Sequence, residues 1–119
     1  MPSEAITPSG IFEEFDTQPP LMRRSFMEKY LGMEVDWSVT FADAWEGHTE
    51  TVRVAFRFEP HSVRMITSDV LLSDYPRLRN LRAGEPLRVR GRIREVSRLW
   101  IELDVAELLF CIEAEPIVA

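Results

Sequence analysis

Apolar and polar residues alternate in two consecutive runs between residues 84 and 110. Alternation with a period of two indicates strands with one buried and one solvent-facing side. Residues 95–98 separate the runs and are short enough for a hairpin turn, and Gly91 predicts a bulge or bend in the first run. The apolar positions are Leu87, Val89, Ile93, Ile101, Leu103 and Val105. The two runs therefore predict a β-hairpin.

The same alternation predicts three strands upstream, over residues 34–44, 51–59 and 62–67. Their apolar positions, expected in the core, are Val35, Trp37, Val39, Phe41, Val52, Val54, Phe56, Phe58, Val63 and Met65. The outward positions of the second and third strands are Thr51, Arg53, Ala55, Arg57, Ser62, Arg64 and Ile66. The five strands together predict a mainly β domain.

Proline and glycine delimit two predicted helices. The first spans residues 21–31, follows a Pro-Pro pair and ends at Gly32. The second is short, begins at Pro76 and ends at Gly84. Their apolar positions are Met22, Phe26, Tyr30, Leu78 and Leu81.

The order of helix, three strands, helix and two strands is that of the OB-fold, a five-stranded Greek-key barrel. Two stretches carry a family resemblance: residues 29–35, KYLGMEV, and residues 81–91, LRAGEPLRVRG. They resemble the Y-x-G-x-x-V and L-x-x-G-x-x-V-x-V-x-G patterns of small bacterial OB-fold proteins in the tRNA-anticodon-binding-like group. The resemblance covers about residues 28–110, and it implies the barrel fold and nucleic acid as a ligand class.

The net charge of −6 belongs to the two ends of the chain. Residues 1–20 contain four acidic residues and no basic one, residues 111–119 contain two more acidic residues, and residues 21–110 are balanced. We expect residues 1–20 to be a flexible acidic tail because they are rich in proline, residues 21–110 to be the helix and barrel, and residues 111–119 to be a second acidic tail. This balance argues against strong non-specific phosphate binding.

The usual OB ligand face lies on the second and third strands. Its predicted basic residues are Arg53, Arg57 and Arg64, and no outward aromatic residue is predicted on these strands for base stacking. Glu46 and Glu50 in the first connection would repel phosphate. We favour a solvated charged surface over a nucleic-acid platform.

A row of arginines marks the outer side of the predicted hairpin: Arg88, Arg90, Arg92 and Arg94. The row is suited to a phosphate backbone or an acidic partner. The alternative, which we favour, is that Asp36, Glu102 and Asp104 on neighbouring strands pair with it. A residual positive patch would then lie toward Arg92, Arg94 and Arg98.

One segment of the N-terminal tail alternates acids with aromatic rings and so mimics a nucleic-acid strand: Phe12, Glu13, Glu14, Phe15 and Asp16. We expect it to dock on an arginine-bearing face, either of its own barrel or of a second copy. The alternatives are a disordered tail, or one whose Phe12 and Phe15 only cover the mouth of the barrel.

Catalytic, metal and cofactor signatures are absent from the sequence. His48 and His61 lack partners at metal-ligand spacing, and Cys111 lacks a nearby histidine. We expect no cofactor and no metal, and a hydrolase or transferase has only the two histidines in its favour. The single cysteine fits a reducing cytoplasm, and no run is apolar enough to span a membrane.

These observations favour a non-enzymatic OB-fold binding module that acts through a protein partner or through self-association. The alternative is binding of single-stranded DNA or RNA through an arginine-bearing barrel face. The residues expected to carry that alternative are Arg53, Arg57, Arg64, Arg92 and Arg94.

Overall fold

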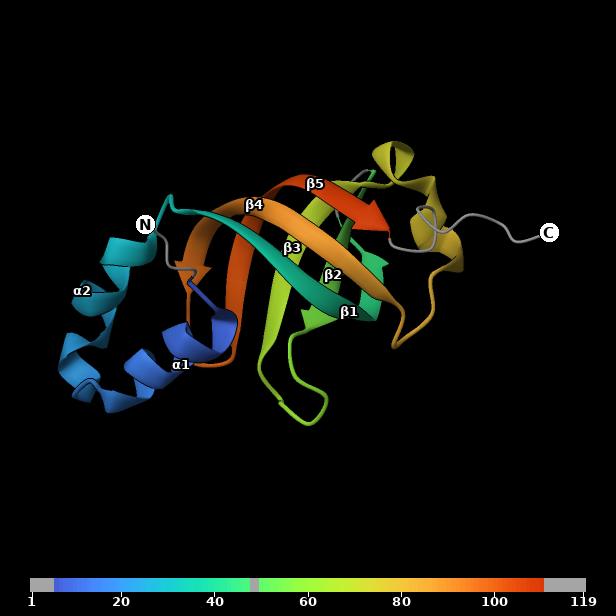
Figure 1. The fold of residues 1–119 in the computed structure, drawn as a ribbon. Coiled ribbons are helices and arrows are strands. Elements are labelled where there is room, and N and C mark those ends of the chain that lie inside the picture. The colour runs from blue at the N-terminus through green and yellow to red at the C-terminus, as the bar shows by residue number, and fades with distance from the viewer. Residues whose placement is uncertain (1–5, 48–49, 111–119) are drawn as a thin grey trace.

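The computed structural model describes residues 6–47 and 50–110 of the 119-residue chain. Its strands in this part are β1 (Glu34–Glu46), β2 (Thr51–Arg57), β3 (Met65–Leu71), β4 (Pro86–Val96) and β5 (Trp100–Phe110). They close into a barrel in the order β1-β2-β3-β5-β4 (Figure 1). The β3–β5 pair is parallel and the other pairs are antiparallel. This order confirms the mainly β, five-stranded barrel predicted from the sequence.

The barrel core is built from the alternating apolar positions, because each strand turns every second side chain inward. Phe56 and Ile66 are opposite each other in the β2–β3 pair, and both are completely buried. The predicted core residues Trp37, Val39, Val54, Leu87, Val89 and Leu103 are also buried. The side chain of Val105 lies outside the described residues.

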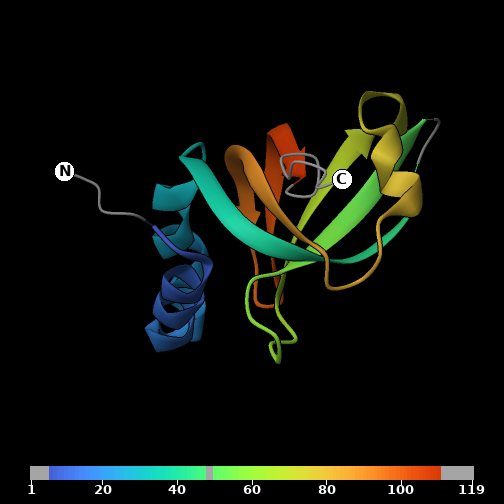
Figure 2. The same ribbon diagram turned by 45° about the vertical axis from the view of Figure 1, so that its right-hand side comes forward.

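Helix α1 (Pro8–Thr17) occupies much of the segment that was expected to be a flexible tail. The Thr7 hydroxyl caps it by accepting a hydrogen bond from the Gly10 N–H at 3.0 Å. Ile11, Phe12 and Phe15 are spaced to share one helical face, and all three are buried. For residues 8–17 the tail prediction is therefore wrong: α1 packs against one end of the barrel (Figures 1 and 2).

The helix predicted over residues 21–31 is broken into three short pieces. These are the 3₁₀ helix η1 (Pro20–Met22), α2 (Arg23–Met27) and the 3₁₀ helix η2 (Glu28–Tyr30). The break changes which side chains face inward: Met27 and Tyr30 are buried, whereas the predicted Met22 is 53% exposed. Gly32 follows with φ +87°, the left-handed conformation expected where a helix stops.

The third strand begins later than predicted, at Met65, because residues 58–64 form a connection. Arg57 donates to the Ser62 carbonyl and the Arg64 N–H donates to the Ser62 hydroxyl, which holds this connection in place. The shift corrects three assignments. Val63 is 77% exposed and outside the core, Met65 is only partly buried opposite the exposed Trp100, and Ile66 faces the core and not the solvent.

The opposite end of the barrel is closed by η3 (Leu72–Asp74) and η4 (Pro76–Asn80), which replace the predicted short helix (Figure 1). Leu78 of η4 is buried there. Register shifts occur at Phe41/Asp43 in the β1–β2 pair and at Arg90/Gly91 in the β4–β5 pair. The second shift is the irregularity that Gly91 predicted.

Candidate functional site

The outer surface of β2, β3 and β5 carries a network of ion pairs between arginines and carboxylates. Arg53 donates through Nη2 to Asp69 Oδ2 at 3.2 Å, and its Nε lies 3.1 Å from Asp69 Oδ1. The Glu102 carboxylate lies 3.7 Å from Arg53 and 3.6 Å from Arg94. Glu102 thus bridges the two arginines, and its side chain is only 12% exposed. The positive charge expected at Arg53 and Arg94 is therefore largely compensated within the chain.

Two further residues of this surface differ from the sequence prediction. Ala55 and Thr67 are paired across β2 and β3, and both are buried, although Ala55 was expected to face the solvent. Arg57 donates through Nη1 to the Ser62 carbonyl at 2.8 Å. Arg57 is thus fixed by the β2–β3 connection and is only partly exposed.

Exposed tryptophans stand on the strands that flank β2 and β3. Trp45 of β1 is opposite Arg53 and is 49% exposed, and Trp100 of β5 is opposite Met65 and is 39% exposed. Trp45 lies beyond the expected end of the first strand, so the alternating pattern did not predict it as an outward aromatic residue. The register shift at Phe41/Asp43 places it on the outer side. The β3–β5 pairing places Trp100 beside the surface of β2 and β3.

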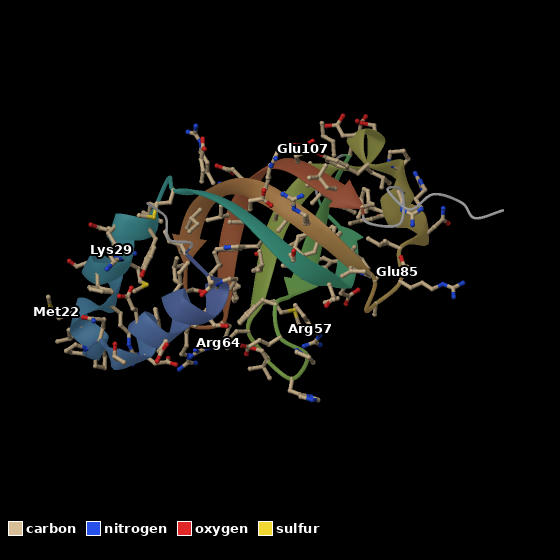
Figure 3. All side chains as sticks on the ribbon, viewed as in Figure 1. Met22, Lys29, Arg57, Arg64, Glu85 and Glu107 are labelled. Carbon is tan, nitrogen blue, oxygen red and sulfur yellow. The ribbon has the colours of Figure 1, made fainter. Side chains whose placement is uncertain are left out.

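The arginine row on β4 is paired along its length with acidic residues of β1 and β5. Arg88 donates to both oxygens of Asp36, at 3.1 and 2.6 Å. Arg90 donates to Glu107 at 2.8 Å, Arg92 donates to Glu34 at 3.1 Å, and Arg94 lies 3.6 Å from Asp104. Glu107, the acceptor for Arg90, is labelled in Figure 3.

The electrostatic consequence is clearest at Asp36. Hydrogen bonds from Arg88, and secondarily from Arg90, lower the pKa of this carboxyl below its ordinary value. The arrangement matches the cross-strand pairing that we favoured from the sequence, with Glu34 and Glu107 as additional acids.

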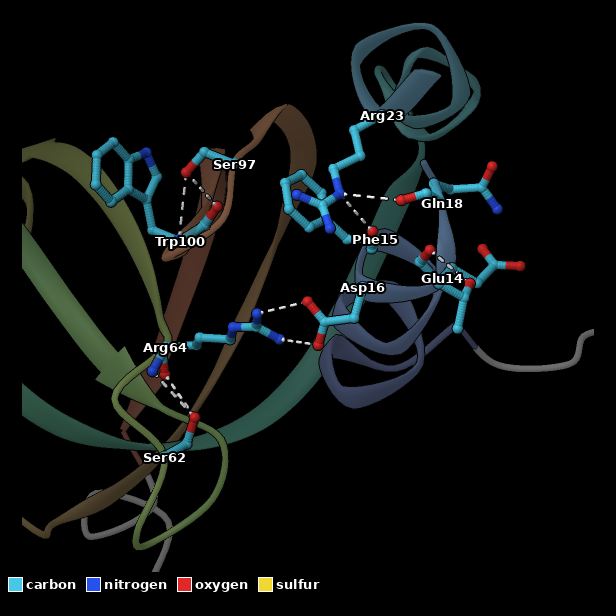
Figure 4. Close-up of polar contacts among 10 residues, drawn as sticks. Glu14, Phe15, Asp16, Gln18, Arg23, Ser62, Arg64, Ser97 and Trp100 are labelled. Atoms are coloured by element: carbon cyan, nitrogen blue, oxygen red, sulfur yellow. Dashed lines mark hydrogen bonds and ion pairs between the residues drawn. The ribbon is translucent and has the colours of Figure 1, made fainter. Parts of the chain in front are cut away.

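The acidic and aromatic segment of α1 contacts the β2–β3 connection of its own barrel. Arg64 donates to both carboxylate oxygens of Asp16, at 2.9 and 2.7 Å (Figure 4). The Arg64 guanidinium also lies 4.9 Å from the centre of the Phe12 ring, which stacks on Phe58 at 5.6 Å. The hydrogen bonds lower the pKa of Asp16 and raise that of Arg64. Arg64 is therefore turned toward α1 and does not join Arg53 in one surface.

Two of the remaining residues of the segment, Phe15 and Glu14, contact α2 and η2. Phe15 is buried and lies under Arg23, whose guanidinium is 4.9 Å from the ring centre. The Glu14 carboxylate is 3.5 Å from Lys29 Nζ. Glu13 is exposed on the outer side of α1.

A groove of about 450 Å³ lies between η1–α2 and the β4–β5 hairpin. Four arginines line it, Arg23 and Arg24 from the helical side and Arg94 and Arg98 from the hairpin. The apolar lining consists of Phe15, Pro20, Met27, Leu31 and Val96, and the acidic lining consists of Glu28 and Glu95. The sequence predicted a positive patch that includes Arg94 and Arg98, but it did not predict that α2 lies beside them.

Within residues 6–47 and 50–110, no cluster of three or more His, Cys, Asp or Glu side chains is arranged to hold a metal ion. His48 and Cys111 lie outside the described residues. No helix in the same ranges is long and apolar enough to cross a membrane.

No protein-family model matches the sequence, and no curated protein does either. The fold is similar to that of two solved structures. A candidate nucleic acid-binding lipoprotein of Klebsiella pneumoniae subsp. pneumoniae aligns with a TM-score of 0.61 and 16% identity, over 87% of this chain and 92% of the lipoprotein. The OBody AM1L10, bound to hen egg-white lysozyme, aligns with a TM-score of 0.55 and 10% identity, over 69% of this chain and 81% of the OBody. At these identities the likeness establishes the barrel fold.

Proposed function

We propose that this protein is a non-enzymatic OB-type binding module that acts through contacts with a protein. The observation that carries the proposal is that the arginines expected to bind a ligand instead contact groups of the same chain. Carboxylates of the same chain contact Arg53, Arg64, Arg92 and Arg94, and Arg57 donates to the Ser62 carbonyl. Phosphate binding draws its affinity from basic groups that release counterions, so compensated arginines contribute little to it.

Protein contacts fit the same surface better. An ion-paired surface offers alternating positive and negative groups, which complement a polar protein surface of mixed charge. Tryptophans that are partly exposed and partly packed, as Trp45 and Trp100 are, commonly anchor protein interfaces. The OBody, a structural neighbour, is bound to the protein lysozyme.

A second candidate function, single-stranded nucleic-acid binding, is favoured by one specific observation. Trp45 and Trp100 flank the β2–β3 surface and offer two exposed rings for base stacking, which the sequence did not predict. The lipoprotein neighbour is named for nucleic-acid binding. The compensated charge of Arg53 between them counts against this candidate.

Fluorescence anisotropy with labelled single-stranded oligonucleotides at low salt separates the two candidates. The proposal expects no saturable binding below about 100 μM, at the weak end of non-specific affinities, and little dependence on salt. Micromolar binding that falls steeply with salt, and that is lost in Trp45→Ala/Trp100→Ala, would instead establish the nucleic-acid function. Sedimentation equilibrium over a range of protein concentrations tests self-association directly.

A further inference from the structure

The groove between η1–α2 and the β4–β5 hairpin differs from the rest of the surface in its charge. Elsewhere the arginines expected to bind ligands contact groups of the chain itself. Among the described residues, no carboxylate forms an ion pair with Arg23, Arg24 or Arg98. All three line this one groove. Arg94, the fourth, is shared between Glu102 and Asp104.

Arg23 is held in place without losing its capacity to bind an anion. Its Nε donates to the Phe15 carbonyl at 3.1 Å and to the Gln18 carbonyl at 3.2 Å (Figure 4). The Phe15 ring supports the guanidinium from one side. These contacts fix the plane of the guanidinium and leave its Nη groups for other acceptors. A preorganised guanidinium binds a carboxylate at a smaller entropic cost than a mobile one does.

We propose that this groove binds an acidic peptide segment of a partner protein, with carboxylates on both sides of a large apolar residue. The carboxylates would meet Arg23, Arg24 and Arg98, and the apolar residue would lie against the more accessible apolar lining, Pro20, Leu31 and Val96. Even with Arg94 left out, because Glu102 and Asp104 compensate it, three arginines against Glu28 and Glu95 give the lining a net positive charge that suits such a segment. The proposal rests on the protein-binding function proposed above and assigns it a site.

The groove favours a peptide over a nucleic acid for two reasons. Phe15 is 8% exposed and lies beneath Arg23, so its ring face does not offer a platform for a base. Glu28 and Glu95 stand in the lining and would repel a chain with a charge on every residue. A peptide can place its carboxylates at intervals and avoid both glutamates.

Exposed apolar side chains lie next to the groove in the sequence. Leu21 is 95% exposed and Met22 is 53% exposed on η1, before Arg23. Leu99, after Arg98, is 44% exposed, and Leu31, in the lining itself, is 47% exposed. These side chains extend the surface that an amphipathic peptide can cover.

The probe is a fluorescein-labelled hexapeptide, Glu-Glu-Leu-Glu-Glu-Phe, measured by anisotropy against the full chain. The variant is Arg24→Glu/Arg98→Glu, since both side chains are exposed and neither carries a hydrogen bond or ion pair within the described residues. We expect saturable binding that weakens about tenfold in the variant, because each exposed pair contributes little alone. The control matched in charge is Arg79→Glu/Arg82→Glu, in and just after η4 at the opposite end of the barrel, which is expected to leave the affinity unchanged (Figure 1).

Two control peptides separate charge from apolar contact. A version with glutamine in place of glutamate, and one with serine in place of leucine and phenylalanine, are each expected to bind more weakly than the probe. Circular dichroism and thermal melting show whether the variant is folded. If Arg24→Glu/Arg98→Glu is unfolded, the single change Arg98→Gln provides the comparison.

The outcomes distinguish this site from the function on which it rests. No saturable binding of the probe, or equal binding by parent and double variant, overturns the groove assignment but leaves the protein-binding function open to other surfaces. If a labelled oligothymidylate binds, and binds more weakly to the same double variant, both proposals fail and the groove is a nucleic-acid site.

Discussion

Arg64 and Asp16, 48 positions apart in the sequence, form a two-point contact in which each Nη group of the guanidinium donates to one carboxylate oxygen. The pair joins α1 to the connection between β2 and β3. Beside it, Phe12 packs between Arg64 and Phe58. Charge and apolar burial therefore act together where the N-terminal helix meets the barrel.

The pKa of Asp16 is expected to lie below its ordinary value of 3.8, and the change Arg64→Ala should raise it toward that value. Because the folded pKa is the lower one, the pair stabilises the fold above pH 3.8, and this contribution is lost as the pH falls through the folded pKa. Carboxyl NMR titration measures the shift. Asp36 is the internal control, since its lowered pKa depends on Arg88 and Arg90 and should not change.

Removal of residues 1–17 is expected to destabilise the barrel, because α1 buries Ile11, Phe12 and Phe15. NMR signals should change at Arg64, at Phe58 and at the Trp37 indole, whose Nε1 donates to the Ile6 carbonyl at 2.7 Å. A tail that does not dock would leave these signals unchanged. If the truncated chain does not fold, Phe12→Leu, expected to cost about 1–2 kcal/mol, gives the same readout.

Phe56→Ala is expected to lower the free energy of unfolding by about 3–5 kcal/mol, because the side chain is completely buried at the centre of the barrel. Urea denaturation followed by tryptophan fluorescence measures the loss. The control is Val63→Ala, at a position that is 77% exposed, where a change within about 0.5 kcal/mol is expected. Equal midpoints for Phe56→Ala and the parent would contradict the inward assignment of β2.

Neutralising the acids that pair with Arg53 tests whether compensated charge suppresses nucleic-acid binding. Asp69→Asn/Glu102→Gln is expected to raise the affinity for a single-stranded oligonucleotide and to make the salt slope steeper by about one. Anisotropy at several salt concentrations measures both. The control Asp74→Asn/Glu85→Gln makes the same charge change away from these pairs, and equal effects of the two variants would mean that net charge alone decides binding.

The strands could be predicted from the sequence because burial in a barrel imposes a period of two on each of them. Phe56, Leu87 and Val89 were placed correctly from that period alone. Gly91 was also identified as an irregular position, because glycine within a strand commonly marks a bulge. Both the alternation and the bulge follow from local backbone geometry, so they can be read from neighbouring residues in the sequence.

The sequence did not show that residues 8–17 form the ordered helix α1. Ile11, Phe12 and Phe15 have helical spacing, but the surrounding prolines and acids suggested a tail. The helix is stabilised by contacts with Phe58 and Arg64, residues that lie more than forty positions away. Its stability is therefore a property of the barrel surface as well as of the segment itself.

By itself, the sequence determined the periods of β1, β2, β4 and β5, the order of the elements along the chain and the presence of an arginine row. Only the tertiary structure decided which arginines are compensated and which are not. Arg53 meets Asp69 because the β2–β3 register sets them opposite each other, whereas Arg23 and Arg98 share a groove because α2 stands beside the hairpin. The interaction between two charges weakens with the distance between them. Strand register and packing fix that distance, and the positions of the residues along the chain do not.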